Sequence, residues 1–177
     1  MSDEPLAKAD WVKAALDRYE RPLIRYAARI TGNVDLARDV VQDTFLRLCE
    51  ADRAKVDGHL AAWLYTVCRN RALDVRKKED RMDSLQQGQA ESVQSSEPEP
   101  SAVAAGNETY GMVFEALCTL PENQQEAFRL KFQDEMTYRE ISQVMGISLG
   151  MVSRLVAAAL SDLREQLRGK IDLVQEV

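Results

Sequence analysis

The chain has 177 residues, of which 45% are hydrophobic and 29% charged, a composition typical of a soluble globular protein with one ordinary domain or two small ones. Its formal net charge of −6 argues against a stand-alone protein that binds nucleic acid without specificity. The first residues lack the apolar core of a signal peptide and no apolar run has the length of a membrane span, so we expect a cytoplasmic protein without membrane insertion.

Apolar residues recur at helical spacing, and with only 8 glycines and 5 prolines this predicts an all-α fold. We expect two small helical domains, residues 1–82 and 109–170, followed by a tail over 171–177. Residues 83–108 are rich in Gln, Ser, Glu, Pro and Ala and show no periodicity. Such a composition buries too little apolar surface to offset the entropy of ordering, so this acidic segment is predicted to be a flexible linker between the domains.

The first domain is predicted to be a bundle of three helices. The first helix extends from Trp11 to Thr31, where Gly32 is a natural stop, and the second extends from about Val34 to Glu50. A polar loop, "ADRAKVDG", follows, and a third helix extends from about His59 to Lys78.

The second helix carries an acidic row. Asp35, Asp39 and Asp43 recur every four residues and therefore share one face, with Gln42 beside them. A solvated acidic face is one interpretation of this row. A docking surface for a basic partner is the other.

The third helix turns basic after an apolar face that includes Trp63 and Tyr65. Its polar residues suit nucleic acid, because cations bind phosphates and amides or rings contact unstacked bases; they are Arg69, Asn70, Arg71, Arg76, Lys77 and Lys78. The alternative is a solvated helix end whose cations favour the carboxyl-terminal dipole, which accounts better for residues 76–78 than for residues 69–71. Trp63 itself is expected in the core rather than as a stacking platform.

The second domain is predicted to begin with a helix over residues 110–118. Thr119 and Glu122 are placed to form a capping box for the next helix, which extends to about Phe132. A second capping box is predicted from Thr137 and Glu140, with Met136 and Ile141 as a hydrophobic staple.

Two helices joined by the short turn 146–148 then fit a helix-turn-helix. Gly146 ends the first of them and Ser148 caps the second, which extends to about Arg168. The inward positions are Ile141, Val144, Met145, Ile147, Val152, Leu155 and Val156. The positions left for reading base edges are Ser148, Leu149, Met151, Ser153, Arg154 and Ala157. An ordinary helical hairpin with good caps is the alternative.

No catalytic, metal or cofactor site is indicated. The three cysteines, Cys49, Cys68 and Cys118, lie far apart in apolar helical stretches and are expected to be small core residues. The single histidine cannot form a metal cluster, and the sequence contains no Gly-rich phosphate loop or nucleophile elbow. An enzyme is therefore not favoured.

Three blocks in order carry a family resemblance. "DLARDVVQDTFLRL", then "HLAAWLYTVCRNRALDVRKK", and after the linker "LPENQQEAFRLKFQDEMTYREISQVMGIS" together resemble a bacterial sigma factor of the extracytoplasmic-function group. The resemblance implies two domains, regions two and four, that join core RNA polymerase and direct it to promoters. It also implies promoter DNA as a ligand, a monomer when free, and an anti-sigma factor as a partner of many members.

By position, the resemblance assigns roles to three sets of residues. The set that docks on core polymerase is Asp35, Asp39, Gln42, Asp43, Phe45 and Arg47. The set that captures and melts the −10 element is Arg53, Lys55, His59, Arg69, Asn70, Arg71, Arg76 and Lys77. The set that reads the −35 element is Arg139, Ser148, Leu149, Met151, Ser153 and Arg154.

The recognition helix departs from the family pattern. Where members commonly have "GTVKSRLHRAL" this chain has "GMVSRLVAAAL", so Ser153, Leu155, Ala157 and Ala158 stand where basic or polar residues are usual. Asn123 and Gln125 stand where arginine is frequent. Each lost phosphate contact weakens DNA binding, and the hypothesis is that tethering to polymerase supplies the missing affinity.

Three other functions stay open. The second domain could serve protein contacts or autoinhibition instead of −35 reading. The chain could be a polymerase-binding adaptor that has lost promoter reading. It could also be a stand-alone helix-turn-helix regulator, although that function does not need a first domain with an acidic strip.

Overall fold

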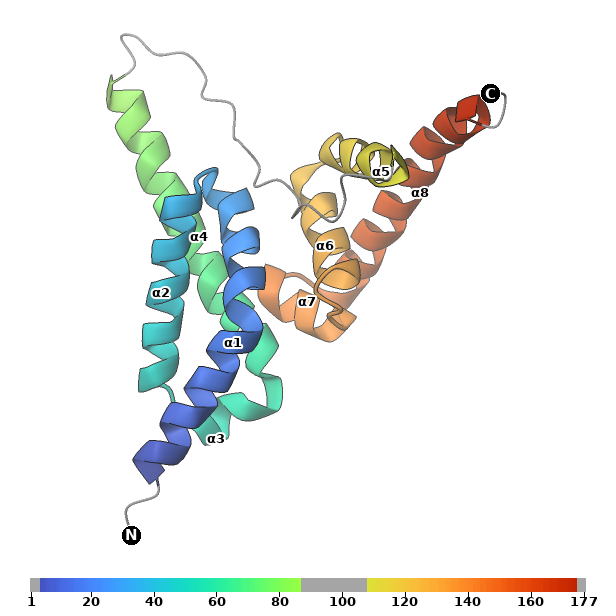
Figure 1. Cartoon of the computed structure of the whole chain (residues 1–177). Coiled ribbons are helices and arrows are strands. Elements are labelled where there is room, and N and C mark those ends of the chain that lie inside the picture. The colour runs from blue at the N-terminus through green and yellow to red at the C-terminus, as the bar shows by residue number, and fades with distance from the viewer. Residues whose placement is uncertain (1–3, 87–107, 175–177) are drawn as a thin grey trace. The chain divides into compact units, whose positions relative to one another are not determined.

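The computed structural model describes residues 4–86 and 108–174, and within these ranges the regular structure is helical, which confirms the all-α prediction. The helices form two compact units, α1 to α4 in one and α5 to α8 in the other (Figure 1). Their bounds are α1 Glu4–Thr31, α2 Val34–Glu50, α3 Arg53–Val56, η1 Asp57–His59 (a 3-10 turn), α4 Leu60–Gln86, α5 Glu108–Cys118, α6 Glu122–Phe132, α7 Tyr138–Met145 and α8 Leu149–Val174. Most of the predicted linker, residues 87–107, lies outside the described residues.

The helix ends follow the predicted stops where a glycine or a cap is present. Gly32 has a φ of +69° after α1, and α2 has the predicted bounds. Three helices are longer than expected: α1 begins at Glu4 instead of Trp11, α4 continues to Gln86, into the predicted linker, and α8 continues to Val174, into the predicted tail. Residues 79–86 contain neither Gly nor Pro, the two residues least favourable to a helix interior, so nothing in them ends α4.

In the first unit, α1, α2 and α4 pack pairwise around one core. The rings of Tyr26 on α1 and Tyr65 on α4 lie 5.1 Å apart, tilted by 53°. The core includes Leu23, Val40, Leu48, Leu64 and Cys68, each at most 1% exposed. These residues come from the helical stripes seen in the sequence, so the bundle hides those stripes and leaves the acidic and basic faces outward.

The segment predicted as a polar loop is helical instead, forming α3 and η1. Asp52 caps α3 by accepting a hydrogen bond from the backbone N–H of Ala54. The segment is held against α1, because Trp11 Nε1 donates to Asp57 Oδ1 at 2.8 Å and Val56 is buried. The prediction failed because one turn of helix is too short to show periodicity, and its anchor, Trp11, lies 46 residues before Asp57 in the chain.

In the second unit, α8 packs against α5, α6 and α7. One buried cluster joins α5 to the carboxyl-terminal half of α8, and it consists of Ala116, Leu117, Leu120, Ala159 and Leu163, with Phe128 of α6 against it. A second buried set joins α7 to the start of α8: Ile141, Val144, Met145, Val152 and Val156. Every inward position predicted for the helix-turn-helix is buried or half-buried.

The predicted capping box of Thr119 and Glu122 is wrong. Pro121 occupies the N-cap of α6 and makes no side-chain cap bond, so Thr119 lies two residues too early to serve. The Thr119 hydroxyl instead contacts the carbonyl of Ala116 and the side chain of Gln166 on α8.

The expectation for the cysteines holds for one of the three. Cys68 is buried, whereas Cys49 and Cys118 are exposed. Trp63, expected in the core, is half-buried.

Candidate functional site

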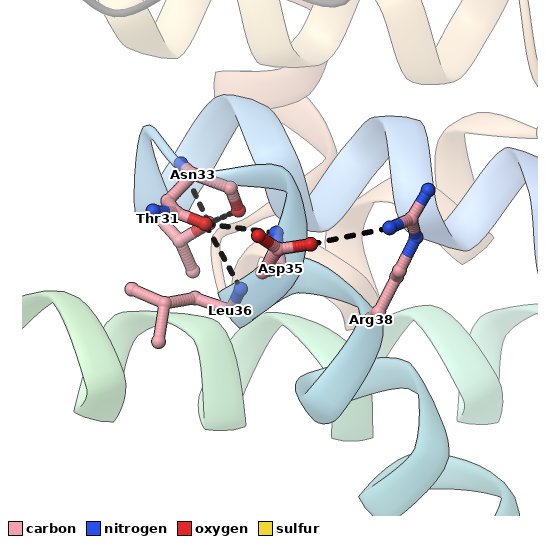
Figure 2. Close-up of polar contacts among 5 residues, drawn as sticks. All are labelled: Thr31, Asn33, Asp35, Leu36 and Arg38. Atoms are coloured by element: carbon pink, nitrogen blue, oxygen red, sulfur yellow. Dashed lines mark hydrogen bonds and ion pairs between the residues drawn. The ribbon is translucent and has the colours of Figure 1, made fainter.

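The start of α2 is fixed by its own side chains (Figure 2). Asn33 caps the helix, since its Oδ1 accepts hydrogen bonds from the backbone N–H groups of Asp35 at 2.8 Å and Leu36 at 3.1 Å. Asp35 lies in the first turn, where a carboxylate is favoured by the helix dipole, and it pairs with Arg38 at 3.1 Å. Asp35 therefore has a structural role in α2 whatever else it binds.

The acidic row of α2 lies largely at the surface. Asp35 and Asp39 are exposed and Asp43 is half-exposed. We call the exposed residues of this face the α2 strip; it comprises Asp35, Asp39, Gln42, Asp43 and Arg47. Phe45, which the resemblance assigned to the same docking set, is 6% exposed and lines the groove beside the strip.

Beside the strip, a groove of about 450 Å³ lies between α1 and α2. Its walls are mostly apolar, formed by Val12, Leu16, Ile24, Val41, Phe45 and Leu46, and Gln42 of the strip also lines it. Leu46 is 57% exposed, so part of the apolar lining is open to water. Sequence reasoning missed this groove; the only signal was a second line of residues at four-residue spacing beside the core stripe of α1, which is apolar at Val12, Leu16 and Ile24 and interrupted by Glu20.

An ion pair joins the α2 strip to the polar residues of α4 that were predicted to bind DNA. Arg71 Nε on α4 donates to Asp43 Oδ2 on α2 at 2.8 Å. The side chains are 42% and 44% exposed. The sequence assigned Arg71 to DNA and Asp43 to a protein partner, and nothing in it indicated that the two would be in contact.

The predicted −10 residues fall into two groups. Arg53, Lys55 and His59 are exposed on α3 and η1, before α4 begins. Arg53 is engaged with its own unit, since its guanidinium lies 5.6 Å from the centre of the Trp11 ring and 3.8 Å from Asp57. Lys55 lies 3.9 Å from Asp52.

The other group lies on α4 itself, between Arg69 and Lys77. It begins about 14 Å along the helix axis from Leu60, the first residue of α4, and spans about 12 Å of that axis. Asn70 and Lys77 are exposed, and because they are seven residues apart they share one face. Arg69 and Arg76 share the neighbouring, half-buried face. The structure thus places Asn70 and Lys77 on one open face of α4, with the exposed Asp74 between them and Arg71 beside this face, in contact with α2.

In the second unit, the helix-turn-helix has the predicted geometry. The Thr137 side chain accepts from the backbone N–H of Glu140, whose carboxylate accepts from the Thr137 backbone in return. Gly146 has a φ of +66°, and the axis then turns by 103° between α7 and α8. This angle lies within the usual range for the motif. Ser148 accepts a hydrogen bond from the backbone N–H of Met151, which confirms it as a cap of α8.

Every predicted −35 residue is exposed: Arg139 on α7, Ser148 before α8, and Leu149, Met151, Ser153 and Arg154 on α8. Arg154 lies on the face opposite the buried Val152 and Val156, between Gly150 and Ala157. Over residues 149–158, this face presents one cation flanked by small residues. Leu149 and Met151, at 49% and 39% exposed, add apolar surface at the helix start.

Two residues of α6 explain why the second unit has fewer surface cations than expected. Gln125, which stands where arginine is frequent, donates from Nε2 to the carbonyls of Cys118 and Leu120 and so ties α6 to the end of α5. Arg129 is 3% exposed, with its guanidinium 5.8 Å from the centre of the Phe114 ring, and cannot reach a phosphate. The unit therefore has fewer surface cations than its composition suggests.

Among the described residues, no single helix is both long and apolar enough to span a membrane, although α7 and α8 joined as a bent pair pass the same test of length and hydropathy.

Comparisons with known proteins identify both units. Residues 15–82 match the model of sigma-70 region 2, and residues 110–163 match the model of sigma-70 region 4. The chain is 31% identical to the extracytoplasmic-function (ECF) RNA polymerase sigma factor EcfG of Rhodopseudomonas palustris over 140 residues, which cover 78% of this chain and 75% of that protein. It is 29% identical to the ECF sigma factor SigL of Mycobacterium tuberculosis over 170 residues, 93% of each chain.

Among solved structures, the sigma factor RpoE from Bartonella quintana, crystallised with the anti-sigma factor NepR, is similar. The TM-score is 0.65 and the identity 27%, over 88% of this chain and 96% of that one.

Proposed function

We propose a role in promoter recognition, starting from the fact that this chain belongs to the ECF group of sigma-70 RNA polymerase sigma factors. In this proposal it binds core RNA polymerase, directs it to a subset of promoters and opens the DNA there. The observation that carries the proposal is the order of the two matches, region 2 on α1–α4 and region 4 on α5–α8. Such a factor acts in the cytoplasm, where the polymerase is, and its role requires no catalytic group of its own.

Core polymerase docks, in this proposal, on the α2 strip. The strip is acidic, exposed and built on a helix whose start is fixed by Asn33, so the carboxylates are presented without further ordering. A basic surface on the partner would be steered to it. The apolar groove beside the strip supplies area that can be removed from water on docking, which charge alone does not provide.

The −10 element is opened by α3, η1 and α4. Extruding a base from the duplex costs on the order of a few kcal/mol, which contacts with the separated strand must return. Asn70 can hydrogen-bond a base edge, and Lys77 on the same face can neutralise a phosphate. Arg53, Lys55 and His59 extend the polar surface beyond the start of α4.

The −35 element is read by the start of α8, with Arg154 as its central cation. One cation and the backbone N–H groups of a helix start bind duplex DNA weakly. Attachment to the polymerase raises the local concentration of this unit at the promoter, so weak contacts suffice.

A second role for the region 4 unit is favoured by its exposed apolar residues. Leu149 and Met151 at the start of α8 suit a protein contact as well as a DNA contact. The similar RpoE was solved with an anti-sigma factor, and we propose that an inhibitor of this type binds this chain too. Transcription from a promoter library with the −35 region scrambled in half of its members separates the roles: indifference to scrambling assigns the unit to protein contacts.

The docking proposal is tested by reconstitution with core polymerase. Asp39→Arg places a cation in the middle of the α2 strip, and like charges brought together at an interface cost several kcal/mol, so we expect association at least about tenfold weaker. Asp39 is the best choice because the described residues offer it no ion pair, whereas reversing Asp43 would also break its contact with Arg71. The measurement is the Kd for core, followed by transcription from promoters selected with the wild-type factor.

The matched control is Asp17→Arg, which makes the same change of charge at an exposed position of α1. It should assemble like the wild type. Full-strength assembly of the Asp39→Arg variant would show that the strip is not the docking surface.

A further inference from the structure

The ion pair between Asp43 and Arg71 joins the two surfaces to which the proposed function assigns different ligands. Asp43 is the member of the acidic row that reaches another helix, since Asp35 pairs within α2 and Asp39 has no ion pair among the described residues. Arg71 lies on α4, one residue after the exposed Asn70, and contacts α2 through Asp43. The pair is therefore a direct electrostatic contact between the α2 strip and the part of α4 that the proposed function assigns to DNA.

Each partner of this pair is occupied by the other. A guanidinium that donates to a carboxylate at 2.8 Å is neutralised there and attracts a phosphate less strongly than a free one. A carboxylate so engaged likewise attracts a cation of the polymerase less strongly. Because both side chains are more than 40% exposed, an incoming group can reach either of them without unfolding the bundle.

We propose that Asp43 restrains Arg71 in the free factor, and that a polymerase cation binding Asp43 releases Arg71 to bind single-stranded DNA. This inference rests on the proposed function and adds to it a positioning residue and a coupling between its two ligands. Coupling between binding sites is reciprocal, so DNA bound at Arg71 raises the affinity of the strip for polymerase by the same factor. Exposed ion pairs are weak, which sets that factor at roughly two- to fivefold.

The first test uses the free full-length chain and a short mixed-sequence single-stranded DNA in a salt series. Asp43→Asn should bind this DNA roughly two- to fivefold more tightly than the wild type, because Arg71 is no longer paired. The dependence of log K on log salt should steepen by about 0.7, the value for one more phosphate contact on a single strand. In the Arg71→Gln background the same Asp43→Asn substitution should change neither quantity.

Asp39→Asn is the matched control, since it removes the same charge one turn away on the same face. A general loss of repulsion from DNA would affect both aspartate variants equally, so equal effects overturn the proposal. Persistence of the Asp43→Asn effect in the Arg71→Gln background overturns it as well. Arg71→Lys, which keeps a cation, should restore the dependence on Asp43.

The second test adds core polymerase and measures the reciprocal effect. The single-stranded DNA should raise the affinity of the wild-type chain for core roughly two- to fivefold, and it should not do so for Arg71→Gln. Equal enhancement in both overturns the coupling. Failure of the proposed function is distinguishable, because the wild-type chain would then neither assemble with core nor support transcription.

Discussion

Cys68 shows how one buried side chain makes stability depend on pH. It is completely buried on α4 and is in contact with Thr44 of α2. Burial raises the pKa of its thiol from 9.0 to about 12, opposed in part by a hydrogen bond with the Thr44 side chain. As pH rises above 9.0, the unfolded chain loses this proton while the folded chain keeps it. The stability that the neutral thiol contributes is thus present below about pH 9 and is lost as pH rises toward 12.

We therefore expect the wild-type chain to lose on the order of 1 kcal/mol of unfolding free energy from this group between about pH 8 and pH 10. The Cys68→Ala variant has no thiol at this position, so its unfolding free energy should fall by that much less than that of the wild type over the same interval. The cavity left by the substitution lowers its stability at every pH. The measurement is urea unfolding in a reducing buffer, followed by tryptophan fluorescence, since Trp11 and Trp63 both lie in the region 2 unit.

Cys49→Ala is the control at an exposed position and should show the wild-type dependence on pH. A Cys68→Ala variant as sensitive to alkaline pH as the wild type would contradict the assignment.

At the scale of elements, the two units are built from helices whose ends are specified locally. Asn33, Thr137 and Ser148 cap α2, α7 and α8 through hydrogen bonds within three residues of themselves. Gly32 and Gly146 end α1 and α7 in the left-handed region, where other residues are strained. Such signals depend on neighbouring residues only, which explains why these ends could be predicted from the sequence.

Two glycines four residues apart provide an element-scale prediction. Gly146→Ala forces an alanine to a φ of +66° and should destabilise the helix-turn-helix by about 1 kcal/mol. Gly150→Ala lies inside α8 with no atom within 4 Å of an added Cβ, and should stabilise the same unit by about 0.5–1 kcal/mol. Hydrogen exchange of the α7 and α8 amides measures both, because the unit contains no tryptophan. The two substitutions should shift protection in opposite directions, and a shift of the same sign in both would refute this reading of the turn.

At the scale of the whole molecule, the net charge of −6 bears on how the chain would bind DNA under the proposed function. Residues 111–170 contain seven Lys and Arg against eight Asp and Glu, and Arg129 among the cations is buried. In the first unit Arg71 is paired with Asp43. Arg129 and Arg71 are thus less available to phosphates in the free chain, and under the proposed function we expect the polymerase to supply much of the affinity for DNA.

The free full-length chain should accordingly bind duplex promoter DNA more weakly than about 10⁻⁵ M at physiological salt, with a shallow dependence on salt concentration. Addition of core polymerase should make binding specific and much tighter. Fluorescence anisotropy with and without core measures both states. Submicromolar, sequence-specific binding by the free chain would instead favour a stand-alone regulator.

Much of the candidate site could be predicted because it depends on helical periodicity. The exposed face of α8 follows from the spacing of Val152 and Val156, and the acidic row of α2 follows from its four-residue repeat. The assignment of Phe45 to the docking set was carried over by position in a motif, and the structure places this side chain in the groove beside the acidic row. The apolar groove between α1 and α2 could not be predicted, since it requires the relative placement of two helices.

By itself the sequence determined the helices, most of their ends, their division between two units and the face that each presents, because periodicity and caps act over a few residues. Tertiary structure decided what depends on how helices pack and rotate against one another. It anchored residues 51–59 to Trp11, exposed two of the three cysteines, and brought Asp43 within hydrogen-bond distance of Arg71. The last two residues are 28 positions apart, and side chains on different helices meet only once packing has fixed both the distance and the rotation of those helices.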